Sequence, residues 1–101
     1  MADAKRLWYD GVMQSNKNTQ QLRELLAEAT ALVPVGSRWR HYKGGEYLVT
    51  AVAFDEESLN FEVIYSPIDA PDIHFARWMS IWLETVRWQN VSLPRFKQMA
   101  D

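Results

Sequence analysis

The chain contains no cysteine, which excludes disulfide bonds, thiolate metal sites and a cysteine nucleophile together. It lacks any apolar run near the roughly 18 residues that a membrane-spanning helix needs. No charged start, apolar core and small-residue cleavage pattern opens it, and internal repeats and low-complexity tracts are absent. The sequence therefore predicts a cytoplasmic protein with no membrane partner.

The length and composition of the chain fit one small domain. The 101 residues are 48% hydrophobic and include five Trp, four Tyr and four Phe, which argues against disorder over most of the length. A chain of this size buries roughly 65% of its unfolded surface. That is enough for one modest core, and we expect no deeply enclosed active site.

Charge is unevenly spread along the chain. The formal net charge is −2, which is not typical of a nucleic-acid-binding protein. Residues 55–74 hold six acidic and no basic side chains, while the flanking segments carry a small excess of basic ones. The acidic stretch would repel nucleic acid, so any such contact must avoid it.

A helix is predicted over residues 19–32. Asn18 is a good N-cap, and Val33 ends the helix because it precedes Pro34. Residues 1–35 are predicted to form a helical extension of the domain. Within the first fifteen residues, the apolar side chains have the spacing of one or two turns of an amphipathic helix. The apolar stripe of the helix consists of Leu22, Leu25, Leu26, Ala29 and Leu32.

From Ser37 the hydrophobic period changes to two, which predicts a β-rich domain over residues 36–101. The expected strands are 37–42, 46–54, 59–65, 73–77 and 87–93, with a Gly44-Gly45 hairpin turn. A short helix near residues 78–86 would bury Trp78 and Trp82. The predicted fold is α+β: a small bent antiparallel β-barrel, SH3-like or Sm-like, that is nearly closed.

The sequence shows no pattern of a catalytic or metal site. His41 and His74 do not stand in a metal-ligand spacing. A nucleophile elbow, a phosphate-binding glycine loop and a dinucleotide fingerprint are all missing. We therefore favour a non-enzymatic protein and expect neither a metal nor a cofactor.

Basic and aromatic residues interleave without an acid in the segment 38–43. Such a segment suits phosphates and stacked bases, or an anionic small molecule. The alternative is a half-buried strand in which Trp39 and His41 pack inward while Arg38, Arg40 and Lys43 stay in solvent. The residues alone leave both interpretations open.

The segment Arg40-His41-Tyr42-Lys43-Gly44, followed by Tyr47 and Val49, resembles the opening segment of the domain of unknown function family 1653. The members of that family are small bacterial and phage-associated proteins. The resemblance spans about residues 36–96 and implies a compact β-rich domain without a known activity. Residues that match the later segments of the family's sequence pattern follow in the same order along this chain. They are Ala53 and Glu57, Val63-Ile64-Tyr65, Arg77, Ile81, Trp82, Glu84 and Val86, and Arg95-Phe96.

Polar and aromatic residues that match the family at fixed places indicate a binding site rather than a core. This candidate ligand-binding set is Arg40, His41, Tyr42, Lys43, Tyr65 and Arg77. Three positions depart from the family: Asp55 stands at a histidine position, Phe75 at a tryptophan and Trp78 at a proline.

Three functions remain open. The first is a non-enzymatic binding module that holds an anionic or nucleotide-like small ligand in an Arg/Tyr-lined groove, with Arg40 and Arg77 side by side. The second is a protein-interaction or inhibitor protein, phage-derived, that acts on a host protein. The third is a single-stranded RNA binder, which the net charge and the acidic stretch disfavour. A monomer and a homodimer both fit the sequence.

Overall fold

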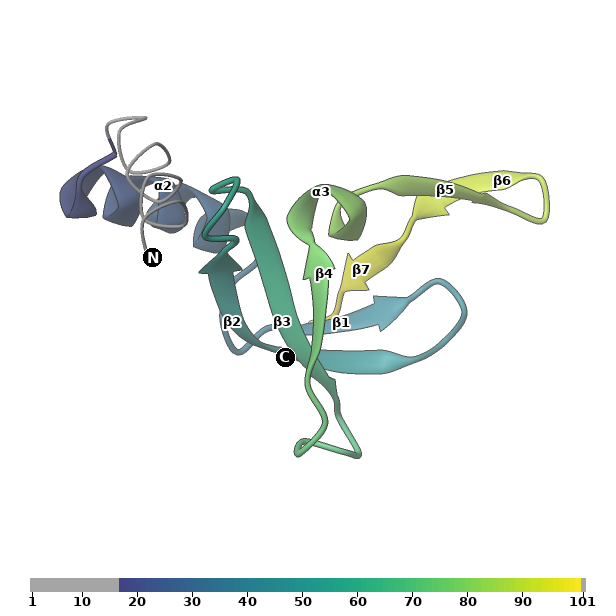
Figure 1. Ribbon diagram of the computed structural model, residues 1–101. Helices are drawn as coiled ribbons and strands as arrows, with labels where there is room; N and C mark the ends of the chain where they lie inside the picture. Colours follow the sequence, from purple (N-terminus) through teal and green to yellow (C-terminus); the bar gives the residue numbers. More distant parts are fainter. Residues whose placement is uncertain (1–16, 101) are drawn as a thin grey trace, which may run out of the picture.

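The computed structural model describes residues 17–100 (Figure 1). The amphipathic turn expected in the first fifteen residues lies outside the described part. No helix in the described range is long and apolar enough to cross a membrane. The elements, in chain order, are α2 (Thr19–Leu32), β1 (Arg38–His41), β2 (Glu46–Phe54), β3 (Phe61–Pro67), β4 (Phe75–Trp78), α3 (Met79–Trp82), β5 (Thr85–Trp88), β6 (Val91–Pro94) and β7 (Phe96–Gln98).

Helix α2 begins and ends where the sequence predicts. The Asn18 side chain accepts a hydrogen bond from the Gln21 N–H at 2.9 Å, and the Gln21 side chain accepts one from the Asn18 N–H at 2.8 Å. This reciprocal pair satisfies backbone donors that the first helical turn leaves free. At the other end Val33 adopts a non-helical conformation before Pro34, as the sequence predicts.

The buried face of α2 differs in part from the predicted stripe. Ala29 and Val33 are 3% and 0% exposed and belong to the same core as the sheet residues, whereas Leu32 is 60% exposed. The change of backbone direction at Val33 places that side chain, rather than Leu32, in the core.

Five strands form one antiparallel sheet in the order β4-β3-β2-β1-β7. A register shift between Val49 and Ala51 marks a bulge in β2, and such a bulge bends a strand and increases its twist. The structure confirms the α+β class, but among the described strands β4 and β7 remain edges and no closed barrel forms. The chain between these two edges forms α3 and a separate hairpin instead of bridging them.

Strands β5 and β6 form that hairpin, which projects from the sheet (Figure 1). The single strand predicted over 87–93 is wrong, because the chain reverses at Gln89 and Asn90, with φ of 51° and 65°. Two residues with positive φ match the twist of the flanking strands. Asparagine favours this conformation and glutamine does not, so the sequence carried little signal for the turn.

Helix α3 is shorter than the predicted helix near 78–86, because β5 already begins at Thr85. Trp82 is fully buried as expected, but Trp78 is 42% exposed. Trp78 ends β4 with extended backbone, so it does not share the helical stripe of Trp82. The strand predicted over 73–77 is β4, which starts at Phe75.

An aromatic cluster fills the core. Trp82 stacks on Phe96, with ring centroids 3.7 Å apart and planes inclined by 6°. Trp39 and Tyr65 pack edge-on against Trp82 at centroid distances of 5.6 Å and 4.8 Å. The indole N–H of Trp39 donates to the Ser37 hydroxyl at 2.7 Å, so this buried polar atom has a partner. The cluster therefore holds β7 and α3 against β1 and β3.

Candidate functional site

Phe96 lies at the centre of the candidate site. His41 packs edge-on against its ring, with centroids 4.9 Å apart, and the guanidinium carbon of Arg77 lies 5.4 Å from its centroid. Tyr65 contacts the same ring at 5.9 Å. These side chains come from β1, β4 and β3, so the structure places three of the six predicted site residues around the Phe96 ring.

Arg77 is held by aromatic side chains. Its Nε donates a hydrogen bond to the Tyr65 hydroxyl at 3.3 Å, and its guanidinium lies over the Phe96 ring. A cation over an aromatic face contributes about 0.5–2 kcal/mol, depending on how far it is desolvated. Within residues 17–100, the ion pairs are Arg40–Glu46 and Arg95–Glu84, and neither involves Arg77. The charge of Arg77 is therefore available to an anion.

Three cations act on His41. Burial lowers the pKa of its imidazole, and the positive charges of Arg77, Arg95 and Lys43 lower this pKa further. Its Nδ1 accepts a hydrogen bond from the Lys43 backbone N–H at 3.1 Å. These effects favour the neutral imidazole. We call Lys43, Arg77 and Arg95, together with the neutral His41 on which they act, the cationic cluster.

Lys43 connects this cluster to two further rings. Its Nζ lies 5.8 Å from the Tyr42 centroid and 5.6 Å from that of Trp88. Tyr42 and Trp88 also contact each other, at 5.4 Å between centroids. Because Trp88 lies at the tip of the β5–β6 hairpin, this contact ties the hairpin to the end of β1. Trp88 is 39% exposed, so part of its ring remains open to solvent.

Arg95 belongs to the site, although sequence reasoning left it out of the candidate set. Its Nη2 pairs with the Glu84 carboxylate at 2.9 Å, and its backbone N–H donates to the Glu84 carbonyl at 2.8 Å. Its carbonyl accepts a hydrogen bond from the Tyr42 N–H at 3.0 Å. These bonds fasten the base of the hairpin to the end of β1. The Arg95-Phe96 pair in the family pattern was the signal that could have identified it.

Arg40 lies on the other face of the sheet. Successive side chains of a strand point to opposite faces, and Trp39 is buried while Arg40 is exposed. Arg40 pairs with Glu46 on β2 and stands opposite Lys97 on β7. The expected groove with Arg40 beside Arg77 is therefore not formed. The inward packing of Trp39 and His41 agrees with the half-buried-strand interpretation of the segment.

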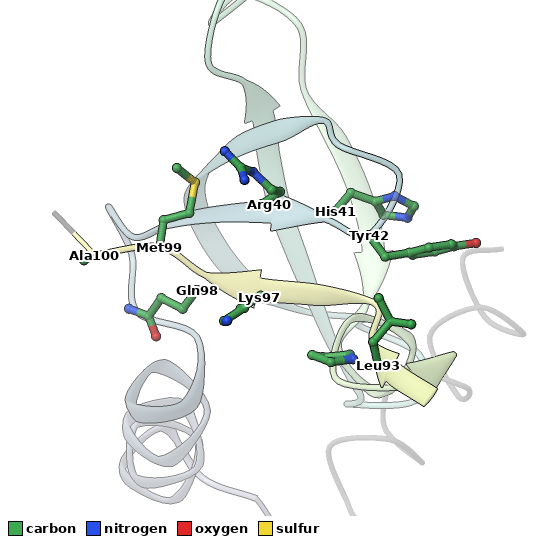
Figure 2. Close-up of a pocket in the computed structure, with 9 residues that line it drawn as sticks. Arg40, His41, Tyr42, Leu93, Lys97, Gln98, Met99 and Ala100 are labelled. Atoms are coloured by element: carbon green, nitrogen blue, oxygen red, sulfur yellow. The ribbon is translucent and has the colours of Figure 1, made fainter. Parts of the chain in front are cut away.

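An open pocket of about 600 Å³ lies beside β1, β6 and β7, and we call it the outer pocket (Figure 2). Figure 2 shows Tyr42 and Leu93 at one end and Arg40 with Met99 at the other. His41 lines this pocket as well, and because His41 belongs to the cationic cluster, the outer pocket adjoins that cluster. The residues around it combine two cations, Arg40 and Lys97, with apolar groups in a space large enough for a small ligand.

Comparison with known proteins shows what this fold is related to. The family model described as protein of unknown function (DUF1653) matches residues 37–98. The chain belongs to the DUF1653 family. The crystal structure of a DUF1653 protein from Bordetella bronchiseptica is similar, with a TM-score of 0.53 and 34% sequence identity, over 60% of this chain and 81% of that chain. A search of curated proteins found no match. Helix α2 lies outside the DUF1653 region.

Two departures from the DUF1653 pattern have a structural account. Asp55 accepts hydrogen bonds from the Ser58 N–H and hydroxyl, both at 2.8 Å, and these bonds lower the pKa of its carboxyl. It therefore closes the turn between β2 and β3. Phe75 packs on Tyr65 at 5.6 Å between centroids, so an aromatic side chain still flanks the site. Within residues 17–100, no group of three or more His, Asp or Glu side chains could hold a metal ion.

Proposed function

We propose that this DUF1653 domain is a non-enzymatic binding module for an anionic, phosphate-bearing ligand, held at the cationic cluster. One observation carries the proposal. Arg77 and Lys43 rest on aromatic rings near His41, and no ion pair among residues 17–100 involves either of them. Cations gathered at one point repel one another, and an anion removes that repulsion.

The residue types suit a phosphate or a carboxylate. The planar guanidinium of Arg77 presents several N–H donors in a fork that matches these groups, and Lys43 adds a mobile positive charge. The partly exposed ring of Trp88 stands beside Lys43, so a ligand with a flat ring gains a stacking surface. A nucleotide-like molecule combines both properties.

The experiment measures thermal stabilisation and calorimetric binding of inorganic phosphate and of a nucleoside monophosphate. A ligand that binds only the folded protein raises its stability by about 1.4 kcal/mol at tenfold excess over Kd. Arg77→Gln should weaken binding by about 10- to 150-fold, which is the loss expected for one charge-assisted contact.

Controls separate loss of binding from loss of folding. Arg23 is exposed on α2, so Arg23→Gln removes the same charge outside the site and should bind like the wild type. Arg77→Lys keeps a cation near Phe96 and should retain part of the affinity. Equal binding by wild type and a well-folded Arg77→Gln variant would contradict the proposal.

A second candidate function, docking of a partner protein, is favoured by the surface around edge strand β4. Ile73, Phe75 and Trp78 are 46%, 45% and 42% exposed. An edge strand offers unpaired backbone groups that an extended segment of a partner can extend into the sheet. A Trp78→Ala variant that keeps phosphate binding but loses a partner that the wild type binds would support this function over the first.

A further inference from the structure

We infer that the ligand is a single strand of nucleic acid rather than a lone nucleotide, because two groups of cations flank one aromatic pair. This inference rests on the proposed function and names the ligand of the same site. The aromatic pair is Tyr42 and Trp88. One cationic group is the cationic cluster, and the other is formed by Lys97 and Arg40 in the outer pocket.

Arg40 and Lys97 lie on the face of β1 and β7 opposite to the face on which His41 packs against Phe96. In the register of β1 and β7, His41 stands opposite Phe96, and Arg40 stands opposite Lys97. Directly opposed residues share a face, whereas neighbours along a strand alternate. Since Glu46 neutralises Arg40, Lys97 supplies the net charge of the outer group. One phosphate cannot contact both faces of a strand, but successive phosphates of one nucleic-acid strand can.

The aromatic pair stands between these groups. Tyr42 lines the outer pocket, while Lys43 of the cationic cluster lies over both Tyr42 and Trp88. Trp88 and its cross-strand partner Val91 are 39% and 59% exposed at the hairpin tip. An exposed ring flanked by cations is the arrangement with which proteins bind single strands, because every base has a face that stacks.

The acidic and basic segments of the sequence also belong to different elements of the fold. Residues 36–45 and 85–100 hold six basic and no acidic side chains, and they form β1, the hairpin and β7. The six acidic residues within 55–74 belong to the β2–β3 turn, β3 and the β3–β4 loop. Figure 1 shows these backbone segments apart from the β5–β6 hairpin. The net charge of −2 therefore does not describe the part of the chain that carries Lys97, Lys43 and Trp88.

The test compares four probes by calorimetry and competition: uridine monophosphate, octauridylate, octathymidylate and an octaglutamate peptide. Both octanucleotides should bind at least about tenfold tighter than the mononucleotide, with affinity that falls with salt in proportion to the phosphates contacted. Lys97→Gln should weaken octanucleotide binding and leave mononucleotide binding unchanged. Trp88→Ala should weaken octanucleotide binding by about 5- to 150-fold, and Trp88→Tyr should restore most of it. Tighter binding of one octanucleotide identifies RNA or DNA as the natural strand.

Each of the other possible results contradicts either the single-strand inference or the proposed function. If the mononucleotide binds as tightly as the octanucleotides, the single-strand inference fails and the proposed function stands. If octaglutamate binds as tightly, the site accepts any polyanion, an acidic peptide included, and the inference fails. If no probe and no inorganic phosphate binds, the proposed function fails as well. Arg23→Gln serves as the charge-matched control, and melting curves of every variant verify folding.

Discussion

The guanidinium of Arg77 lies over the ring of Phe96, 5.4 Å from its centroid. The same ring stacks on Trp82, at the centre of the aromatic core. One residue therefore serves both as a core element and as the support of the candidate site. If the proposed function holds, this ring couples stability to ligand binding, and substitutions there should affect both.

Phe96→Ala should destabilise the protein by about 3–5 kcal/mol, because it removes a buried ring and leaves a cavity beside Trp82. Chemical denaturation followed by tryptophan fluorescence measures the loss. Leu32→Ala is the control, since Leu32 is 60% exposed and should change the stability by less than about 0.5 kcal/mol. A loss below about 1 kcal/mol for Phe96→Ala would contradict the packing described above.

Stability should fall in acid partly through His41. Its pKa is lowered in the folded state by burial and by nearby cations, so the unfolded chain binds more protons as the pH falls below the ordinary value of 6.5. The contribution of the neutral imidazole is thus present above pH 6.5 and is lost as the pH falls through the lowered pKa. We expect the unfolding free energy of the wild type to decrease more steeply below pH 6.5 than that of His41→Gln. Parallel curves for the two proteins would show that His41 has no such effect.

Gln89→Gly should stabilise the hairpin, because Gln89 adopts φ of 51°, a conformation that side chains other than glycine and asparagine disfavour. The expected gain is up to about 1 kcal/mol, reduced by the greater freedom of glycine in the unfolded chain. The matched control is Gln98→Gly in β7, which has no positive φ to relieve and should destabilise. Denaturation of the two variants against the wild type gives both values. A loss of stability in Gln89→Gly would mean that this residue makes contacts that outweigh its strained backbone.

Elements specified by neighbouring residues were predictable from the sequence. The Asn18 cap and the Val33-Pro34 ending bound α2, and alternating side chains locate β2 and β3. The hairpin escaped prediction because its turn lacks the glycine that usually marks such a reversal. The prediction that Trp78 is buried in a helix was wrong, because Trp78 and Trp82 have helical spacing in the sequence but the backbone at Trp78 is extended.

Some residues of the candidate site were predictable from the sequence, and others were not. The family resemblance singled out His41, Tyr65 and Arg77, and the structure groups them around Phe96. It also included Arg40, whose position on the opposite face depends on the pairing of β1 with its neighbours. Arg95 belongs to the site because its positive charge acts on His41 and because its bonds to Glu84 and Tyr42 hold it there, and no local spacing specifies these contacts.

The sequence by itself determined the α2 helix, the first strands and membership of the DUF1653 family, because these depend on residues close together along the chain or on their order. Only the tertiary structure decided that the sheet stays open, that Trp88 of the hairpin contacts Tyr42, and that Arg77 lies over Phe96. The physical reason is that charge, stacking and strand pairing act between groups that are near in space. The stack of Trp82 on Phe96 brings distant parts of the chain to one place.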